Sequence, residues 1–363
     1  MIKRLLWGVL SLVVGVGLII SCEKATDTKT IEAGVVVHKV EKVTITDSSG
    51  SNVEIPVNIS NIADAWGAHN AIVAMLGAGD KISATTLTEK TKPWLFKVTP
   101  AMSKAELAFN VDATDINMEE LVKNKPDILF MSQGNKNISK ITDVGIPVVQ
   151  VSFKDFNSLK ECVNLTGQIL GKEGEARAEK YNSYLDEKLK MVIDETSKIP
   201  QDKKLKILHL ADFSPIKVDG RDTIIDAWIQ AAGGVNAADF SGTKGVTIEQ
   251  IMNWNPDVII LSSTVGSSDR KKSAVEMLND DTWKELSAVK NGKVYINPDG
   301  AFSWDRYSAE EALQIQWAAK TMYPDKFKDI DVPNETKWFY KTFFNYELSD
   351  DETKRILNAE PPQ

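Results

Sequence analysis

Two stretches in different halves of the chain repeat one pattern of residues. Residues 116–132 read INMEELVKNKPDILFMS, and residues 246–262 read VTIEQIMNWNPDVIILS. Each begins with a helix N-cap candidate, Asn117 or Thr247, and reaches a Pro-Asp pair that ends the helix, because proline disfavours helical conformation in the residue before it. The residues after each Pro-Asp pair are all apolar, as in parallel strands that are covered on both faces. The repeat predicts two α/β units, each with a helix that leads into a buried strand.

The similarity continues on both sides of the repeat. Upstream, residues 70–86 and 223–239 both read as a helix that ends at glycine. Downstream, residues 145–149 and 292–296 both read as glycine followed by a second strand. Chance similarity between two βα units, which are common, is the alternative. We predict an α/β fold with two Rossmann-like lobes built on parallel sheets, at residues 41–164 and 201–348, followed by a polar C-terminal tail at residues 349–363.

The segment between the lobes, residues 165–200, is predicted to be a single long α-helix. No proline or glycine occurs from Ala176 to Thr196, and apolar residues recur there close to helical spacing. Pro200 ends the pattern. A helix of about 30 residues is roughly 45 Å long. Such a rod permits small rocking of the lobes rather than wide hinge closure.

The N-terminus has the features of a lipoprotein signal. Lys3 and Arg4 precede an apolar run at residues 5–20, and a small residue, Ser21, stands before Cys22. We predict a signal peptide at residues 1–21, cleavage before Cys22, lipidation of its thiol, and a flexible tether at residues 22–40. Two or more acyl chains give stable membrane anchoring. An uncleaved anchor helix is the alternative, and in both cases we expect the rest of the chain on the extracytoplasmic face of the cell membrane.

The composition and the small number of histidines and cysteines argue against nucleic-acid binding, a metal site and enzymatic activity. The chain has 43 basic and 51 acidic residues, a net charge of −8 and no basic run, which argues against nucleic-acid binding. With Cys22 lipidated, Cys162 has no partner for a disulfide and is expected to be buried. No tight His, Cys, Asp and Glu cluster has metal-ligand spacing, so we expect no metal site and no cofactor. Three scattered histidines and no Gly-x-Ser-x-Gly elbow argue against an enzyme, with an extracytoplasmic hydrolase as the remote alternative.

The order of these segments resembles the substrate-binding lipoproteins of ABC importers whose lobes are joined by one long helix. Those proteins are receptors for iron-siderophores, haem and cobalamin, with a few for other metals. The likeness spans about residues 53–330 and is carried by residues 71–86, 116–132, 145–153, 165–196, 246–263 and 291–324.

The resemblance implies a monomer with a ligand cleft between its lobes and docking onto a permease dimer through one acidic residue per lobe. Glu249 matches the second-lobe docking glutamate of the family. Where the family has its first-lobe glutamate, this chain has no acidic residue and Asn137 lies nearby. Glu119 or Glu120 is the suggested substitute.

Four loops are candidates for lining the cleft, because ligands of open α/β sheets lie beyond the carboxyl ends of the strands. They are residues 63–69, 87–109, 132–135 and 297–307. A helix that begins near residue 66 offers N–H groups to an anion, and arginine beside aromatic rings suits an anionic or planar chelate. The predicted ligand-binding residues are Trp66, His69, Trp94, Gln133, Trp304, Arg306 and Tyr307.

Each of these residues also has a structural interpretation. His69 is equally expected to cap or pack a helix, and Trp94 to hold its own loop down. Trp304 would then fill the core while Arg306 pairs with Asp305. For the ligand, family frequency favours an iron(III)-chelate such as a siderophore complex. The alternatives are molybdate or tungstate, and then cobalamin or haem.

Overall fold

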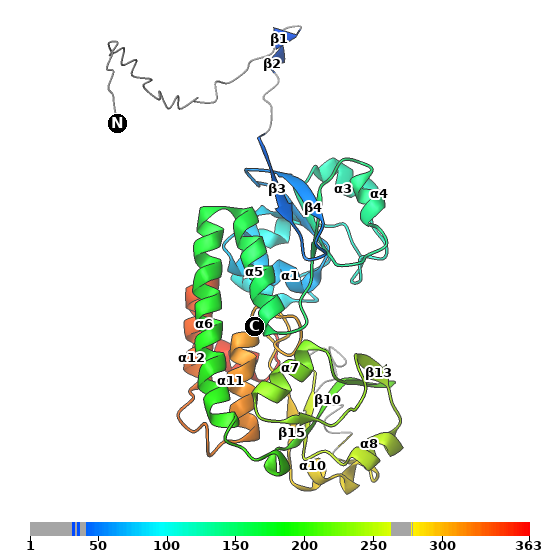
Figure 1. The fold of residues 1–363 in the computed structure, drawn as a ribbon, viewed down its shortest axis with the longest axis vertical. Coiled ribbons are helices and arrows are strands. Elements are labelled where there is room, and N and C mark those ends of the chain that lie inside the picture. Colours follow the sequence, from blue (N-terminus) through cyan, green and yellow to red (C-terminus); the bar gives the residue numbers. More distant parts are fainter. Residues whose placement is uncertain (1–30, 33–34, 37–40, 263–276, 278) are drawn as a thin grey trace, which may run out of the picture. The chain divides into compact units, whose positions relative to one another are not determined.

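A computed structural model describes residues 31–32, 35–36, 41–262, 277 and 279–363. The predicted signal peptide, Cys22 and most of the predicted tether lie outside these residues. Residues 1–40 and 41–363 are separate units. The first contains a short antiparallel hairpin of β1 (Ile31–Glu32) and β2 (Val35–Val36), and the second contains both lobes (Figure 1).

The first lobe is built on a five-stranded sheet in the order β7-β6-β5-β8-β9, with all neighbours parallel. The strands are β5 (Ile62–Asp64), β6 (Ile82–Thr85), β7 (Glu106–Leu107), β8 (Ile128–Ser132) and β9 (Val148–Val151). A hairpin of β3 (Lys42–Thr46) and β4 (Asn52–Pro56) precedes them. The helical segments are α1 (Gly67–Met75), η1 (Gly79–Lys81), α2 (Pro93–Val98), η2 (Pro100–Lys104), α3 (Met118–Asn124) and α4 (Ile138–Thr142).

The second lobe is built on a six-stranded sheet in which β10, β12, β14 and β15 are parallel. They span β10 (Lys206–Phe213), β12 (Val235–Asn236), β14 (Val258–Leu261) and β15 (Val294–Ile296). Two further strands, β11 (Ile216–Asp219) and β13 (Thr243–Gly245), join antiparallel, a feature that the sequence did not predict. The helical segments are η3 (Gln201–Lys203), α7 (Ile224–Ala231), α8 (Ile248–Trp254), η4 (Trp283–Glu285) and α10 (Ser287–Lys290).

The internal repeat corresponds to equivalent structure in the two lobes. Asn117 and Thr247 are the N-caps of α3 and α8, and each helix ends in a left-handed residue before its Pro-Asp pair. Asp127 Oδ2 accepts the N–H of Asn61 at 2.9 Å, and Asp257 Oδ2 accepts the N–H of Lys206 at 2.8 Å. Each aspartate therefore fastens the start of its own strand to the start of the neighbouring parallel strand. The predicted α/β fold of two similar lobes is confirmed.

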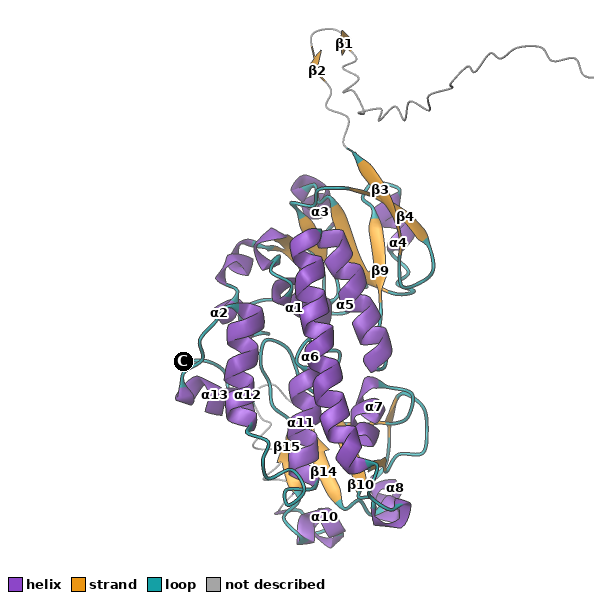
Figure 2. Cartoon of the chain, turned by 60° about the vertical axis from the view of Figure 1, so that its left-hand side comes forward, coloured by secondary structure: helices purple, strands orange, loops and turns teal. Residues whose placement is uncertain are grey.

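The connection between the lobes differs from the predicted single helix. Helix α5 (Phe156–Leu170) ends at Gly171, and α6 (Lys172–Thr196) begins directly after it. Gly171 has a φ of 85°, which turns the chain so that α5 and α6 pack side by side (Figure 2). The rod that reaches the second lobe is therefore the 25-residue α6, about 37 Å long. The prediction that one helix begins at residue 165 is wrong.

The C-terminal part of the chain returns across α6 instead of remaining in the second lobe. Helix α11 (Glu311–Met322) packs on α6 and α7, α12 (Val332–Phe339) packs on α11, and the π-helical turn η5 (Tyr340–Phe344) reaches α1. The predicted polar tail forms helix α13 (Asp350–Leu357), in which Ile356 is fully buried. The boundary at residue 348 and the description of a tail are corrected accordingly, because this segment has an apolar face that packs on α12.

Both sheets are covered on both faces, which explains their uniformly apolar strands. Leu129 and Met131 of β8 face one buried cluster of the first lobe, whereas Phe130 faces the cluster shared with α5, α6 and the C-terminal helices. The strands of the second lobe divide in the same way, with Ile259 and Ile260 in different clusters. This packing fixes the carboxyl ends of β5, β6 and β9 relative to the loop after β15.

Candidate functional site

The N-terminus of α1 lies at the carboxyl end of β5. Trp66 is the N-cap residue, and its N–H donates to Asp64 Oδ1 at 3.1 Å. The next N–H groups, on Gly67 and Ala68, have no carbonyl partner within the helix, as in the first turn of any α-helix. The helix dipole adds partial positive charge at this position. The first lobe therefore presents backbone donors that favour an anion.

The Thr86 hydroxyl lies against this first turn. Thr86 directly follows β6 and is 5% exposed, and its Oγ1 has no hydrogen-bond partner among the described residues. A Cβ atom added to Gly67 would lie 3.3 Å from this oxygen and 3.0 Å from Leu87 Cδ2. Glycine at position 67 therefore permits the close approach. An unpartnered buried hydroxyl costs about 1–3 kcal/mol, so a ligand that accepts its hydrogen bond would recover that free energy.

The second lobe contributes Arg306 from the loop after β15. Its Nη2 donates to Asp219 Oδ2 at 2.6 Å, and the side chain is 21% exposed. Its Nε is buried without a hydrogen-bond partner among the described residues and lies 3.9 Å from Asp305 Oδ2. The Asp219 carboxylate thus holds one edge of the guanidinium, and the Nε–H donor remains available.

Three aromatic rings join the two lobes beside these donors. The ring centroid of Trp66 lies 5.3 Å from that of Phe153 and 5.8 Å from that of Tyr307, and Phe153 and Tyr307 are 5.6 Å apart. Tyr307 has a φ of 54°, a left-handed conformation that bulky residues rarely adopt and that tends to occur at functional sites. We call this region the interlobe site; its residues are Trp66, Gly67, Ala68, Thr86, Phe153, Arg306 and Tyr307.

A buried ionic cluster supports Arg306 from behind. His209 Nδ1 lies 2.8 Å from Asp219 Oδ2, and its Nε2 lies 3.1 Å from Asp305 Oδ2. Burial alone would raise the pKa of Asp219, but His209 and Arg306 lower it to about 2. Burial alone would lower the pKa of His209, but its two aspartate partners raise it. Two cations therefore balance two carboxylates, and the cluster leaves little net charge to oppose an incoming anion.

Glu311 is a further buried carboxyl group close to this cluster. Neither of its oxygens has a hydrogen-bond partner among the described residues. Burial raises the pKa of Glu311 well above its usual value, and the nearby Asp305 carboxylate raises it further. Both effects favour the neutral, protonated form of this carboxyl group.

The structure brings three of the seven predicted residues together, namely Trp66, Arg306 and Tyr307. Gln133 is exposed on the same edge of the first-lobe sheet, where its Oε1 accepts from Ser152 Oγ at 2.8 Å. Ser152 directly precedes Phe153, so Gln133 lies at the rim of the interlobe site.

The other three predicted residues are buried and satisfied by the chain itself. Trp94 Nε1 donates to the Glu360 carbonyl at 2.8 Å, and Trp304 Nε1 donates to Glu310 Oε1 at 2.9 Å. His69 lies 2.8 Å from Asp64 through Nδ1 and 2.9 Å from Thr166 through Nε2. These positions favour the structural interpretation of all three.

Sequence reasoning missed several residues that shape the site. Thr86 directly follows β6 and Phe153 lies two positions after β9, so a search of the first two positions after each strand would have found them. Lys92 ties the lobes, because its Nζ donates to Ser303 Oγ at 2.7 Å and lies 3.2 Å from Asp299 Oδ1. Nothing in the sequence pairs Lys92 with Asp299, since they are 207 positions apart.

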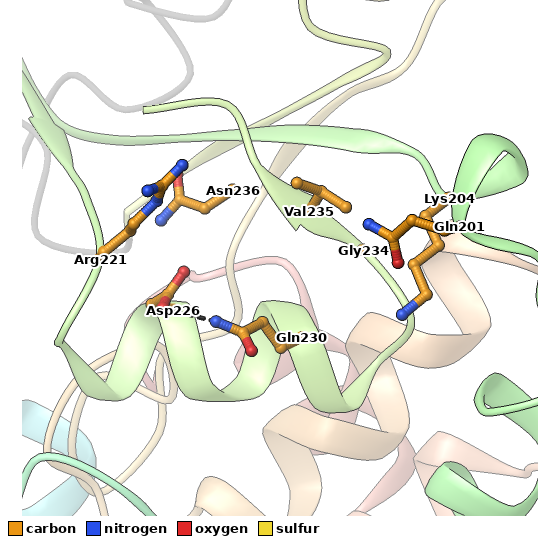
Figure 3. A pocket seen from close by; sticks show the side chains of 8 residues that line it. All are labelled: Gln201, Lys204, Arg221, Asp226, Gln230, Gly234, Val235 and Asn236. Carbon is orange, nitrogen blue, oxygen red and sulfur yellow. Dashed lines mark hydrogen bonds between the residues drawn. The ribbon is translucent and has the colours of Figure 1, made fainter. Parts of the chain in front are cut away.

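A solvent-accessible pocket of about 270 Å³ lies elsewhere, on the second lobe between α7, β12 and η3 (Figure 3). It shares no lining residue with the interlobe site. We assign the principal site to the interlobe region, because buried donors without partners occur there and both lobes contribute to it. Across residues 41–262 and 279–363, no group of three or more His, Cys, Asp and Glu side chains is arranged to hold a metal ion. Within the described part of the chain, no helix is long and apolar enough to cross a membrane.

Two α/β lobes, a helix that spans them and a polar site between them define the chain as a two-lobed binding protein. The sequence profile of the periplasmic binding protein family matches residues 66–301. The chain therefore belongs to that family, whose relatives are the binding components of ABC importers. Members of the family are extracytoplasmic substrate-binding proteins rather than enzymes, and they bind small ligands and work with ABC permeases.

Three similar proteins give the closer context. The molybdate-binding protein MolA of Haemophilus influenzae is 26% identical over 86% of this chain and 93% of its own length. Its structure with molybdate matches at a TM-score of 0.75 and 23% identity, covering 85% of this chain and 99% of that one, which shows the shared fold. A periplasmic solute-binding protein of Veillonella parvula matches at a TM-score of 0.75 and 27% identity, over 88% of this chain and 97% of that one. The iron-uptake system-binding protein of Bacillus subtilis is 26% identical over 52% of this chain, and the match spans only 62% of that relative.

Proposed function

We propose that this binding protein captures a small tetrahedral oxyanion, molybdate or tungstate, at the interlobe site and delivers it to its permease. The observation that carries the proposal is the pair of buried, unpartnered donors, Thr86 Oγ1 and Arg306 Nε. They belong to opposite lobes: Thr86 lies against Gly67 in the first turn of α1, and Arg306 precedes Tyr307, whose ring contacts Trp66. An oxyanion accepts hydrogen bonds from several directions, so one ligand can satisfy donors from both lobes.

The charges around the site support an anion. Arg306 offers a fixed cation, since Asp219 holds one edge of its guanidinium, and a helix N-terminus favours negative charge. The site also suits a compact ligand, because Trp66, Phe153 and Tyr307 already contact one another across the lobes. A macrocycle would have to separate these rings. MolA, the relative named for molybdate, is matched over 93% of its length.

An iron(III)-chelate, the first choice of the sequence analysis, is the second candidate. The observation that favours it is the same aromatic trio, because planar or catechol-bearing chelates stack on aromatic rings and arginine. For such a ligand the lobes would open at the Trp66–Tyr307 contact. No observation of comparable strength favours cobalamin or haem.

Isothermal titration calorimetry tests the assignment. Molybdate, tungstate, sulfate, ferric citrate and haemin are titrated into the protein, and the metal content of protein purified from its host is measured in parallel. We expect binding of molybdate and tungstate, with tryptophan fluorescence changing because Trp66 lines the site. Binding of ferric citrate with no response to molybdate would establish the second candidate and refute the first. A chain that binds none of these ligands would refute both.

We further propose that lipid on Cys22 anchors a monomeric receptor at the outer face of the cell membrane and that Glu249 docks on the permease. Glu249 is exposed in the first turn of α8. The repeat places Glu119 at the equivalent position of α3, where it is also exposed, whereas Glu120 pairs with Lys123 at 3.1 Å. Asn137 is engaged within its own lobe, donating to the Ala113 carbonyl at 2.9 Å. Glu119 is therefore the proposed first-lobe contact.

A further inference from the structure

The second-lobe pocket has a distribution of charge that the interlobe site does not use. Its volume is about 270 Å³, and it lies along α7 between the loop after β11 and the segment that follows η3. Figure 3 shows Arg221 at one end, Lys204 at the other, and Asp226 and Gln230 of α7 between them. A cavity with a cation at each end suits an elongated molecule with two negative groups.

No described carboxylate is in direct contact with either cation, although Asp226 of the same pocket interacts electrostatically with Arg221. Neither Arg221 nor Lys204 forms an ion pair or a side-chain hydrogen bond with another described residue. By contrast, Lys290 Nζ lies 2.7 Å from Glu285 Oε2, and Lys123 Nζ lies 3.1 Å from Glu120 Oε2. Two unpaired cations that line one cavity are therefore available to bind carboxylates.

The middle of the pocket is suited to a hydroxyl group. Gln230 Nε2 donates to Asp226 Oδ2 at 2.7 Å, which leaves the Gln230 amide oxygen and the other Asp226 oxygen as acceptors. Burial raises the pKa of Asp226, although hydrogen bonds from Asn236 and Gln230 oppose this. A third carboxylate would be repelled at this position, whereas a hydroxyl would donate to either acceptor.

We propose that this pocket is a second binding site, for a small hydroxy-dicarboxylate. One carboxylate contacts Arg221, the other contacts Lys204, and the hydroxyl between them donates to Asp226 or Gln230. Because the pocket shares no lining residue with the interlobe site, the two sites fill independently.

Calorimetric titration with L-malate and succinate, the same dicarboxylate without the hydroxyl, tests the proposal. We expect malate to bind more tightly than succinate, and its affinity to fall about tenfold in each of Arg221→Gln and Lys204→Gln, as for the loss of one charge-assisted hydrogen bond. Lys217→Gln is the matched control, since Lys217 is exposed on the same lobe outside the pocket. All three substitutions are at the surface, and unchanged melting temperatures would show intact folds.

Two results would overturn the proposal. The first is the absence of malate binding at millimolar concentration, or equal binding by the wild type and both pocket variants. The second is competition between malate and molybdate or ferric citrate, which would place malate at the interlobe site. Unchanged malate affinity in Arg306→Lys would support a separate pocket, whether or not the interlobe ligand is an oxyanion.

Discussion

Replacing Arg306 by lysine tests the oxyanion site while retaining its positive charge. The guanidinium of Arg306 is a planar fork: its Nη2 donates to Asp219 Oδ2 at 2.6 Å, and its Nε has no hydrogen-bond partner among the described residues and can donate to a ligand. Lysine has a single ammonium group, so it can remain with Asp219 or reach the ligand but cannot reproduce both contacts in the same geometry. The substitution should therefore remove one charge-assisted hydrogen bond to the ligand.

The expected loss follows from the energetics of such a bond. A hydrogen bond to a charged group contributes about 1.5–3 kcal/mol net. Because every 1.4 kcal/mol is about tenfold in affinity, Arg306→Lys should weaken oxyanion binding roughly 10- to 150-fold. The loss should lie mainly in affinity and not in stability, since the charge that balances Asp219 remains.

Calorimetry with molybdate measures the affinity, and urea denaturation measures the stability of the same samples. Arg355→Lys is a matched control, because Arg355 is 20% exposed against 21% for Arg306 and also binds an aspartate, Asp351, at 2.8 Å. The control should bind molybdate as the wild type does. Unchanged molybdate affinity in a folded Arg306→Lys protein would refute the role given to the Nε donor.

Four further predictions address the fold, the docking face and the anchor. Burial would lower the pKa of His69, but Asp64 raises it to about 10, so the contribution of the protonated histidine to stability is complete below about pH 6.5. That contribution is lost as the pH rises towards 10, and the unfolding free energy falls by at most about 1.4 kcal/mol per pH unit. Urea denaturation at several pH values should show that this pH dependence is absent in His69→Ala. Burial also raises the pKa of Asp64, so the pair weakens again in acid, where that carboxyl group is protonated. Trp94→Phe should lower the unfolding free energy by about 1 kcal/mol through loss of its bond to the C-terminal segment, while the exposed Trp338→Phe should have little effect; equal effects would contradict the assigned role. Glu249→Lys should abolish uptake by cells but leave ligand binding by the purified protein intact, and uptake at the wild-type rate would exclude this contact. Cys22→Ala should move the protein from the membrane fraction to the soluble fraction, and continued membrane association would exclude the lipid anchor.

Local patterns were sufficient to predict the repeated parts of the fold. The caps at Asn117 and Thr247, the Pro-Asp pairs and the apolar strands after them all act within a few residues of one another. Their structural outcome is therefore encoded in short segments, and the structure contains them as predicted. The position of Trp66 at a helix start after a strand was predictable for the same reason.

The break between α5 and α6 depended on contacts that a helical pattern does not contain. A Cβ atom on Gly167 would lie 2.7 Å from Ala178 Cβ and 2.9 Å from the Gly174 carbonyl oxygen. These glycines allow two helix backbones to approach closely, and Gly171 provides the left-handed turn between them. Periodicity alone favoured one continuous helix, because each half is helical taken by itself.

The sequence by itself determined the two-lobed α/β architecture and the loops from which a site could be built, because the positions of the repeated strands and the helix starts follow from local chemistry. Only the tertiary structure decided which side chains in those loops remain available. Trp94 and His69 found partners far along the chain and Trp304 found Glu310 six residues on, whereas Thr86 and Arg306 were left with unpaired donors between the lobes. Burial and hydrogen-bond satisfaction depend on what packs against a residue, and that packing partner is usually remote in sequence.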